Sequence, residues 1–494
     1  MTLAKYTSWT LLLVVGFSLI SGFSAAQDPT KVPQRGSSTD IEERRDAGTI
    51  DKKDKVAVEA AKKTFASFAK YYAEIIAHPL VYKAAQQDGS LKILDGKPVD
   101  AASKPIPTIE EKIKELEKFI LEPNPAITVF RDDATELKVS KKHADYIREF
   151  GAALDDALKP VIESSTERVI RVNAMRMYAA ACKSGAPAHW PTVIELLKNA
   201  NTKTEVKYYA LQAAANLLSA SDVFDYKSRR HAFTVSDKRS ENDKQIGELI
   251  AAVEACILDP NTVIEGIPEG KIENASADQL DVVRFVRRQA IKTLAQVRSV
   301  TLPGPDGKPL FPALTLARVC MSDPALVPAP SPAECAEAVI GLCNMAPVVG
   351  GAPVKGFNTD SLAEAVTTGL ITFAKPRAEK PLDRTLAWRN YSYRLGEAFK
   401  NWRPIFDTGF DPTKPTDFNP APGEKAVGAV IALAQDTILA PIGKIDDNGK
   451  LVDGLAVDLT KLRTLLKQLQ AKEGRTGLLI NGVPETAMPV AAAK

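Results

Sequence analysis

The chain has 494 residues, of which 45% are hydrophobic and 25% are charged, a composition typical of globular proteins and not of disordered or collagen-like chains. Its 64 Lys and Arg residues nearly balance 61 Asp and Glu residues, so the formal net charge of +3 gives no electrostatic reason to expect nucleic acid as a partner. The length allows either two or three ordinary domains or one long array of repeats.

Residues 1–26 predict a secretory signal peptide. Lys5 precedes an apolar run at residues 9–23, and Ser24 and Ala26 supply the small side chains that precede a cleavage site. We expect cleavage after Ala26 and export to the periplasm or the extracellular space, with no membrane span in the mature chain. The alternative is an uncleaved N-terminal anchor, because the apolar run approaches the shortest membrane-spanning length of about 17 residues.

Two segments of the mature chain predict little structure. Residues 27–54 are dominated by polar and charged side chains with almost nothing to bury, which predicts a disordered tether. Residues 476–494 predict a flexible tail, because chain termini fray unless packing holds them. The folded part is therefore expected between these two segments.

The first part of the folded region, residues 55–161, predicts helices. From Lys55 onward, apolar residues recur three or four positions apart, as an amphipathic helix requires, until Pro79 ends or kinks the pattern. A second helix is expected to begin at Thr108, which can form a capping box with Glu111. A third helix is expected from about Lys141 to the end of this region.

Short turn sequences separate some of the predicted helices. Residues 94–99, 305–310 and 447–451 each contain Asp-Gly or Asn-Gly, whose backbones tolerate the positive φ angles of tight turns. We expect small surface hairpins at these places. Because no long alternating pattern of apolar and polar residues occurs, a large sheet is not expected.

A short pattern recurs in the middle of the chain. Residues 170–175, 206–211 and 286–291 each begin with a β-branched residue and a base, and end with Ala and an apolar residue. The copies begin at residues 170, 206 and 286, and the interval from 206 to 286 is about twice a repeat period of roughly 40 residues. The branched residue and the Ala fall on one helical face, where the Ala lets a neighbouring helix approach closely.

The helix predicted before the second copy strengthens this repeat. Residues 190–199 contain Pro191 and a Leu-rich face, and the next helix opens with Val206 and Lys207. This arrangement resembles a HEAT-type repeat, in which a helix A with Pro near its start precedes a helix B that opens with Val-Arg. The chain departs from that pattern at Lys207, where Arg is usual, and at Asn199, where Asp is usual.

The resemblance covers roughly residues 165–345. Residues 246–258 and 311–319 are similar to further A helices, although residues 259–279 then form a long insertion. Pairs at residues 359–402 and 424–472 are inferred only from amphipathic patterns. The resemblance implies an all-α fold, an irregular HEAT-like α-α superhelix over residues 162–475 with a helical N-terminal cap and short hairpin insertions.

The five cysteines all follow the signal peptide, where an oxidising compartment permits disulfides. They are Cys182, Cys256, Cys320, Cys335 and Cys343. Because their number is odd and their spacing irregular, we expect mostly buried thiols. Cys335 and Cys343 are predicted on one helix, too far apart along its axis to bridge. If a disulfide forms, we expect it to join Cys320 to Cys335 or Cys343.

The sequence predicts no catalytic residue, no cofactor and no metal site. The four histidines are isolated and lack metal-binding motifs, the nucleophile elbow of hydrolases is absent, and residues 443–451 fit neither a phosphate loop nor an EF-hand. Adjacent acids such as Asp155 and Asp156 point to different faces of a helix, so we expect them to be solvated charges.

Two groups of residues are candidate partner-binding surfaces, because bases beside aromatic residues are typical of interfaces. The first group is in an inter-helix insertion and comprises Lys227, Arg229, Arg230 and His231. The second comprises Trp388, Arg389, Trp402 and Arg403. The alternative interpretations are a solvated loop for the first group and packing between helices for the second.

We therefore expect an exported, non-catalytic helical-repeat scaffold that binds a protein or a component of the cell envelope. One alternative is an exported enzyme with a site in the insertions at residues 222–245 or 259–279. Another is a structural spacer of the envelope, attached through its N-terminal tether. The oligomeric state is not predicted.

Overall fold

The computed structural model divides the chain into two compact units, residues 1–192 and 193–494, each of which we describe by itself. The described residues are 31–35, 39–47, 50, 54–87, 89–121, 129–131, 137–139, 144–225, 230–233, 239–265, 271–297, 299–305, 308–345, 348–349, 352–353, 357–380, 386–406, 425–443 and 457–471. Within them helices dominate, and the strands form only two-stranded hairpins, which confirms the predicted all-α fold. The predicted signal peptide lies outside the described residues.

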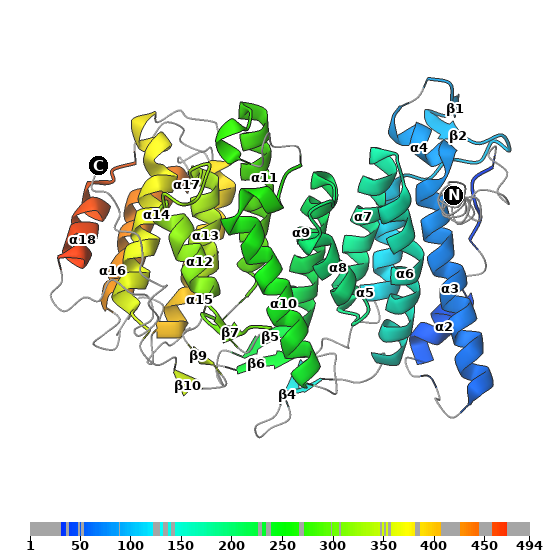
Figure 1. Cartoon of the computed structure of the whole chain (residues 1–494), viewed down its shortest axis with the longest axis horizontal. Helices are drawn as coiled ribbons and strands as arrows, with labels where there is room; N and C mark the ends of the chain where they lie inside the picture. The colour runs from blue at the N-terminus through cyan, green and yellow to red at the C-terminus, as the bar shows by residue number, and fades with distance from the viewer. Residues whose placement is uncertain are drawn as a thin grey trace, which may run out of the picture. The chain divides into compact units, whose positions relative to one another are not determined.

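Unit 1 contains the first helices of the chain and three short elements between them (Figure 1). Its helices are α2 (Thr39–Ala47), α3 (Lys55–Ala77), α4 (Pro79–Ala85), α5 (Ile109–Leu121), α6 (Ala144–Ser164) and α7 (Arg168–Ala181), followed by the 3₁₀ turn η1 (Cys182–Ser184). Its hairpins are β1 (Lys92–Leu94) with β2 (Lys97–Val99), and β3 (Val129–Arg131) with β4 (Leu137–Val139). The division between the units falls within α8 (His189–Lys198), after Thr192.

The predicted helix starts in unit 1 are confirmed. The carboxylate of Asp54 accepts hydrogen bonds from the first backbone N–H groups of α3. At the start of α5, the side chain of Thr108 accepts from the Glu111 N–H at 3.2 Å, and Glu111 accepts from the Thr108 N–H at 2.9 Å. Both caps satisfy N–H groups that have no partner inside the helix. The hairpin β1–β2 also confirms the predicted turn at residues 94–99.

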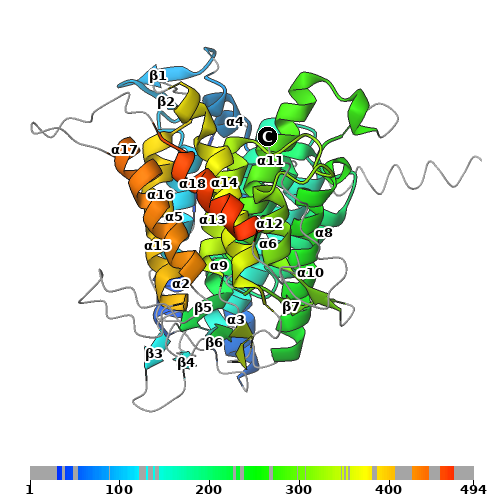
Figure 2. The ribbon, with the colours of Figure 1, turned by 90° about the vertical axis from the view of Figure 1, so that its left-hand side faces the viewer.

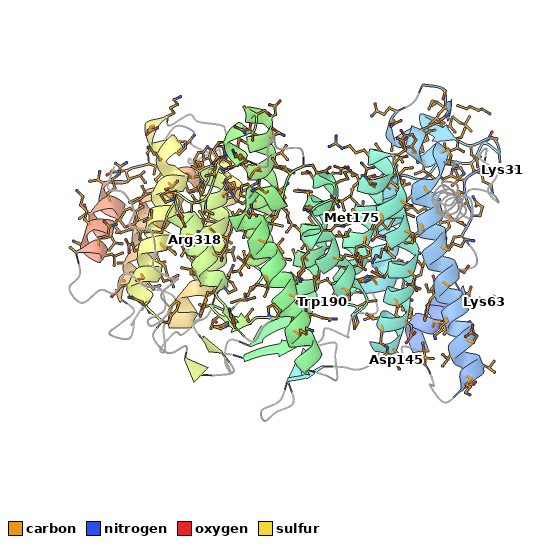
Figure 3. The ribbon with its side chains drawn as sticks, viewed as in Figure 1. Lys31, Lys63, Asp145, Met175, Trp190 and Arg318 are labelled. Carbon is orange, nitrogen blue, oxygen red and sulfur yellow. The ribbon has the colours of Figure 1, made fainter. Side chains whose placement is uncertain are left out.

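The core of unit 1 lies between α3 and α6, with α7 packed against α5 and α6. The rings of Phe65, Tyr146 and Phe150 lie within 5.7 Å of one another, and all three side chains are fully buried. Met175 on α7 is enclosed by the side chains around it (Figure 3). Because α7 contains residues 170–175, the first copy of the repeat pattern belongs to unit 1. The sequence pattern instead assigns this copy to the repeat region that begins at residue 162.

Part of the predicted tether is ordered, which corrects that expectation for residues 31–35 and 39–47. Ile41 in α2 is fully buried and Val32 is nearly so. Arg35 forms an ion pair with Glu115, and its guanidinium lies 5.3 Å from the ring centre of Phe119. The segment has few apolar residues, but those it has are buried, and its arginine finds an acid on α5.

Unit 2 contains the remaining helices and three hairpins (Figure 1). Its helices are α9 (Thr204–Ser221), α10 (Arg239–Leu258), η2 (Pro260–Thr262), η4 (Ile272–Asn274), α11 (Ala277–Leu294), α12 (Pro312–Cys320), α13 (Pro332–Asn344), α14 (Thr359–Glu379), α15 (Trp388–Phe406), α16 (Lys425–Ala434), the π-helical turn η5 (Gln435–Leu439), α17 (Ala440–Gly443) and α18 (Thr460–Gln470). Its hairpins are β5 (Asp222–Asp225) with β6 (Arg230–Phe233), β7 (Leu302–Pro303) with β8 (Pro309–Leu310), and β9 (Val348–Val349) with β10 (Ala352–Pro353).

The helices of unit 2 pack in two rows. One row consists of α9, α11, α13 and α15, each of which contacts the next. The other row contains α10, α12 and α14, which lie side by side in Figure 1. Helices that follow each other in sequence, such as α10 and α11 or α12 and α13, connect the rows. At the C-terminal end, α18 lies across α14 and α16 (Figure 2).

The base in the repeat pattern has the same role in the second and third copies. Lys207 on α9 is 2% exposed, and its ammonium donates a hydrogen bond to the carbonyl oxygen of Thr262, in the loop after α10. Arg287 on α11 is also 2% exposed and donates to the carbonyl oxygen of Pro328, in the loop after α12, at 2.7 Å. Each base therefore connects its own helix to the loop of the following helix pair.

A second regularity lies in the loops themselves. After α8, α10 and α12, the side-chain oxygens of Asn199, Asp259 and Asp323 each accept a hydrogen bond of 2.9 Å from the backbone N–H two residues later. Such turns fix the direction of the chain as it leaves a helix. The side-chain oxygen of Asn199 therefore accepts the same hydrogen bond as the carboxylates of Asp259 and Asp323, and the three loops share one local geometry.

Close approach between helices depends on glycine at one position of α13. A Cβ atom at Gly341 would lie 2.6 Å from Leu316 Cδ1 of α12 and 2.9 Å from the Cβ of Ala295 at the end of α11. Such distances are shorter than any ordinary contact between carbon atoms. The missing side chain therefore lets α13 sit against both helices.

Candidate functional site

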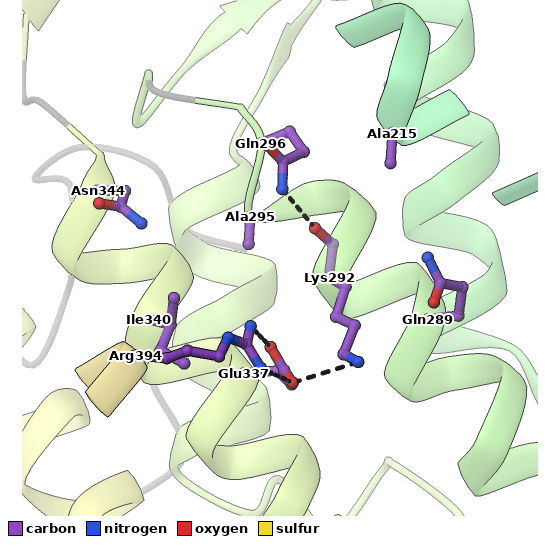
Figure 4. A pocket seen from close by; sticks show the side chains of 9 residues that line it. All are labelled: Ala215, Gln289, Lys292, Ala295, Gln296, Glu337, Ile340, Asn344 and Arg394. Carbon is purple, nitrogen blue, oxygen red and sulfur yellow. Dashed lines mark hydrogen bonds and ion pairs between the residues drawn. The ribbon is translucent and has the colours of Figure 1, made fainter. Parts of the chain in front are cut away.

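A pocket of about 330 Å³ opens on the row of α9, α11, α13 and α15 (Figure 4). It is lined by Ala215, Gln289, Lys292, Ala295, Gln296, Glu337, Ile340, Asn344 and Arg394. Most of these side chains carry hydrogen-bonding groups, and the volume is within the range of pockets that hold small ligands or single side chains. The four helices of the row each contribute at least one lining residue.

Glu337 forms the centre of this pocket. Its side chain is fully buried on α13, and both of its oxygens accept hydrogen bonds from the guanidinium of Arg394 on α15, at 2.7 and 2.5 Å. The ammonium of Lys292 on α11 lies 3.6 Å from Glu337 Oε1. A bidentate pair of this kind compensates the burial of the carboxylate and orients the guanidinium.

Glu337 shifts the pKa values of two neighbouring side chains, Tyr391 and Arg394. Burial and the nearby carboxylate of Glu337 raise the pKa of Tyr391 to about 12. The guanidinium of Arg394 lies 5.7 Å from the centre of the Tyr391 ring, a cation–π distance. Its hydrogen bonds to Glu337 also raise the pKa of Arg394. Tyr391 is therefore neutral and Arg394 is charged near neutral pH.

An aromatic cluster lies on the same row of helices. Phe285 on α11 is 46% exposed and stacks on Tyr208 of α9, with ring centres 4.6 Å apart and planes 17° apart. The guanidinium of Arg288 lies 5.7 Å from the centre of the Phe285 ring, and its charge also acts on Tyr391. Because Phe285, Arg288 and Lys292 are spaced three and four residues apart, they share one face of α11.

The pocket and the aromatic cluster thus form one surface, which we call the α9–α15 face. It comprises Tyr208, Phe285, Arg288, Lys292, Glu337, Tyr391 and Arg394. Each of these residues contacts or electrostatically affects another member of the group. The face combines exposed aromatic area with two positive charges more than its negative ones.

The structure locates only some of the residues predicted to bind a partner. Trp388 is 6% exposed, with its ring 5.1 Å from that of Phe373, so it belongs to the core of unit 2 and not to its surface. Arg389 is exposed on α15. Arg230 and His231 are in β6, opposite Asp225 and Phe224 of β5, and their side chains are outside the described residues. Lys227 and Arg229, and the side chains of Trp402 and Arg403, also lie outside them.

The sequence reasoning did not find the α9–α15 face. A signal was present in α11, where Phe285, Arg288 and Lys292 put an aromatic ring and two bases on the face opposite the core residues Val286 and Ala290. Nothing in the sequence around Glu337 on α13 indicated a site, because its partner Arg394 on α15 is far away in sequence.

A buried polar cluster in unit 1 corrects the expectation for Asp155. Its carboxylate accepts hydrogen bonds from the hydroxyl groups of Tyr178 and, at 3.1 Å, Thr192. Burial alone would raise the pKa of Asp155, but these donors and the ring of His189, 3.6 Å away, lower it below its ordinary value. Asp155 is therefore a structural acceptor and not a solvated charge. The His189 side chain is fully buried, which is typical of a structural role.

Glu334 and Glu254 are among the other buried acidic side chains of unit 2. Arg287 donates from Nε to Glu334 at 2.6 Å, and both side chains are almost completely buried. Glu254 on α10 accepts a hydrogen bond of 2.7 Å from the hydroxyl of Thr315 on α12. Burial raises the pKa of Glu254 from 4.5 to about 7.

The five cysteines are buried and unpaired in this structure. Cys335 and Cys343 share α13, as predicted, and the thiol of Cys320 interacts with both of them. Burial raises the pKa of the Cys335 thiol to about 12 and that of Cys256 to about 11. Such thiols are protonated near neutral pH and are poor nucleophiles.

The described part of the chain lacks two further features. It contains no cluster of three or more His, Cys, Asp or Glu side chains arranged to hold a metal ion. It also contains no helix that combines the length and apolar character needed to cross a membrane.

Comparison with known proteins adds no relative. No protein-family model, no curated protein sequence and no solved structure matches this chain significantly. The function of the chain is therefore inferred from its own residues and their contacts.

Proposed function

We propose that this chain is an exported, non-catalytic helical-repeat scaffold that binds a protein partner through the α9–α15 face. One observation supports the proposal most directly: Phe285 is 46% exposed although it stacks on Tyr208 and lies beside Arg288. Aromatic and arginine side chains together are enriched among the residues that dominate protein interfaces. A face built around them is suited to a macromolecular partner.

The size and charge of the face favour a protein segment over a small molecule. A further exposed apolar side chain, Val282, lies one helical turn before Phe285 on α11 and is 39% exposed. A ligand confined to the pocket would leave Phe285 and Val282 in water. Because Arg288, Lys292 and Arg394 outnumber the single carboxylate of Glu337, the expected partner segment is acidic as well as partly apolar.

The repeat architecture forms part of the same proposal. The hydrogen bonds that Lys207 and Arg287 donate to the loops of the following helix pairs support a HEAT-like superhelix, in which each pair stacks on the next. The shared turn geometry at Asn199, Asp259 and Asp323 supports it as well. Solenoids of this kind present one row of helices as an extended binding surface.

Export is the second part of the proposal and has its own test. The apolar run at residues 9–23, followed by Ser24 and Ala26, supports secretion with cleavage after Ala26. N-terminal sequencing of the protein recovered from the exported fraction is expected to begin at Gln27. A sequence that begins at Met1 would contradict cleavage and favour the anchored alternative.

The binding proposal is tested by site-specific photo-crosslinking in the full-length exported protein. A photoreactive amino acid is placed at position 285, at position 282 or, as a control, at position 375, where Lys375 on α14 is 61% exposed. The proposal expects the same partner to be captured from positions 285 and 282 and not from 375. The purified partner should then bind the chain, and Arg288→Ala should weaken that binding. Equal capture from all three positions, or none, would refute the proposal.

A further inference from the structure

We infer that the pocket on the α9–α15 face binds a carboxylate side chain of the partner, with Lys292 as the group that contacts it. This inference rests on the proposed function and adds the chemistry of the partner's segment. The observation behind it is the difference between two cations that share one acid, Glu337.

Arg394 already forms a bidentate ion pair with Glu337. Its two hydrogen bonds of 2.7 and 2.5 Å use both carboxylate oxygens, so the pair is neutral as a unit. Lys292 lies at the same acid but at 3.6 Å from Oε1, beyond hydrogen-bond distance. Its side chain is 38% exposed at the pocket. The ammonium can therefore turn its N–H donors to an incoming group without breaking an existing hydrogen bond.

The rest of the pocket suits an anion. With Arg394 and Glu337 paired, Lys292 leaves the pocket with one net positive charge. Arg288, one helical turn before Lys292 on the same face of α11, adds a second. The side-chain amides of Gln289 and Gln296 line the same space and can donate to carboxylate oxygens (Figure 4). Because Glu337 is screened by its guanidinium partner, it does not repel a second carboxylate as an isolated acid would.

The exposed aromatic side chains identify the source of that carboxylate. Phe285 is one helical turn from Arg288 and two from Lys292 along the same face of α11. A segment that places a Glu side chain in the pocket can lay an apolar side chain on the exposed part of Phe285 at the same time. A free dicarboxylic acid cannot make the second contact. We therefore assign the pocket to an acidic, apolar-containing segment of a protein.

The inference is tested with three probes on the full-length protein. The first is a fluorescein-labelled peptide in which Glu and Leu alternate, the second is the same peptide with Gln in place of Glu, and the third is free glutarate. The Glu peptide is expected to bind more tightly than the Gln peptide by about tenfold, the ratio that one charge-assisted hydrogen bond typically provides. Raising the salt concentration should reduce this ratio, because screening weakens the ionic contact.

Variants at one position decide whether Lys292 carries the discrimination. Lys292→Gln should bring the Glu and Gln peptides to equal affinity, whereas Lys292→Arg should keep the preference. Lys375→Gln on α14 removes an exposed charge elsewhere and should change nothing. Equal binding of the two peptides by the unaltered protein, or an unchanged preference in Lys292→Gln, would overturn the inference. Glutarate that binds as tightly as the Glu peptide would overturn the assignment to a protein segment.

The two proposals fail in different ways. If crosslinking from position 285 captures a partner whose binding does not depend on the charge of Lys292, the proposed function stands and the carboxylate site is wrong. If crosslinking captures no partner while the Glu peptide still discriminates, the carboxylate site stands and the scaffold proposal is wrong.

Discussion

Arg287 and Glu334 give the sharpest test of how unit 2 is held together. Their side chains are 2% and 0% exposed, and Arg287 donates to Glu334 at 2.6 Å and to the carbonyl oxygen of Pro328 at 2.7 Å. Glu334 also accepts from the backbone N–H of Ser331 at 2.7 Å, within the capping box of α13. The pair therefore joins α11, the loop after α12 and the start of α13.

The expected cost of breaking this pair follows from what each substitution leaves behind. Arg287→Met buries an uncompensated carboxylate, which typically costs about 3–5 kcal/mol, and the cap at Ser331 places the cost at the lower end of that range. The lost donor to Pro328 adds about 1 kcal/mol. Glu334→Gln removes the negative charge and leaves a buried guanidinium with only neutral acceptors, the Gln amide oxygen and the Pro328 carbonyl, at a cost of about 3 kcal/mol. The double variant buries no charge, so it should cost at least about 2 kcal/mol less than the sum of the single variants.

The assay is native-state hydrogen exchange in the full-length protein, followed at the amides of α11 and α13, because it reports the free energy of opening of these helices separately from unit 1. Arg284→Met is the matched control on the same helix. Its ion pair with Asp281 has a similar length of 2.9 Å, but the side chains are 38% and 75% exposed, so its loss should cost no more than about 1 kcal/mol. Additive costs in the double variant, or a control as damaging as Arg287→Met, would refute the reasoning.

Three further predictions concern other buried groups. Burial raises the pKa of Glu254 from 4.5 to about 7, so the free energy of unfolding should fall by about 3 kcal/mol as the pH rises from 4.5 to 7. Glu254→Gln should remove this fall when urea unfolding is compared at pH 5 and 8. The same change in unfolding free energy between the two pH values in both proteins would contradict the prediction. Tyr178→Phe removes a buried donor to Asp155 and should cost about 1–3 kcal/mol in unfolding free energy; an unchanged urea midpoint would show that the donor is dispensable. Gly341→Ala should destabilise unit 2 by about 1–3 kcal/mol in the same measurement, because its Cβ would meet Leu316 and Ala295, whereas Gly89→Ala, with no atom within 4 Å, is the neutral control.

The features that could be predicted from sequence depend on neighbouring residues. The start of α5 at Thr108 and the hairpin at residues 94–99 follow from cap and turn chemistry within four or five positions. The order at residues 31–35 and 39–47 was missed because it depends on distant partners. Ile41 is buried by the fold, and Arg35 finds Glu115 on another element.

The candidate site was missed for a related reason. The sequence ranked surfaces by local density of bases and aromatic residues, which selected Trp388, yet that ring is buried against Phe373. The α9–α15 face instead gathers its residues from four helices that are far apart in sequence. Only packing brings Glu337 between Lys292 and Arg394, so no short stretch of sequence contains the pattern.

The hydrogen bonds of Lys207 and Arg287 restrict how such a chain can change its length in evolution. Each base is buried, and the carbonyl that accepts from it belongs to the next helix pair. Deletion of the pair α12–α13 would leave Arg287 as a buried cation without its acid or its carbonyl. Helix pairs can therefore be gained or lost only as blocks that bring both a base for the following block and an acceptor for the preceding one.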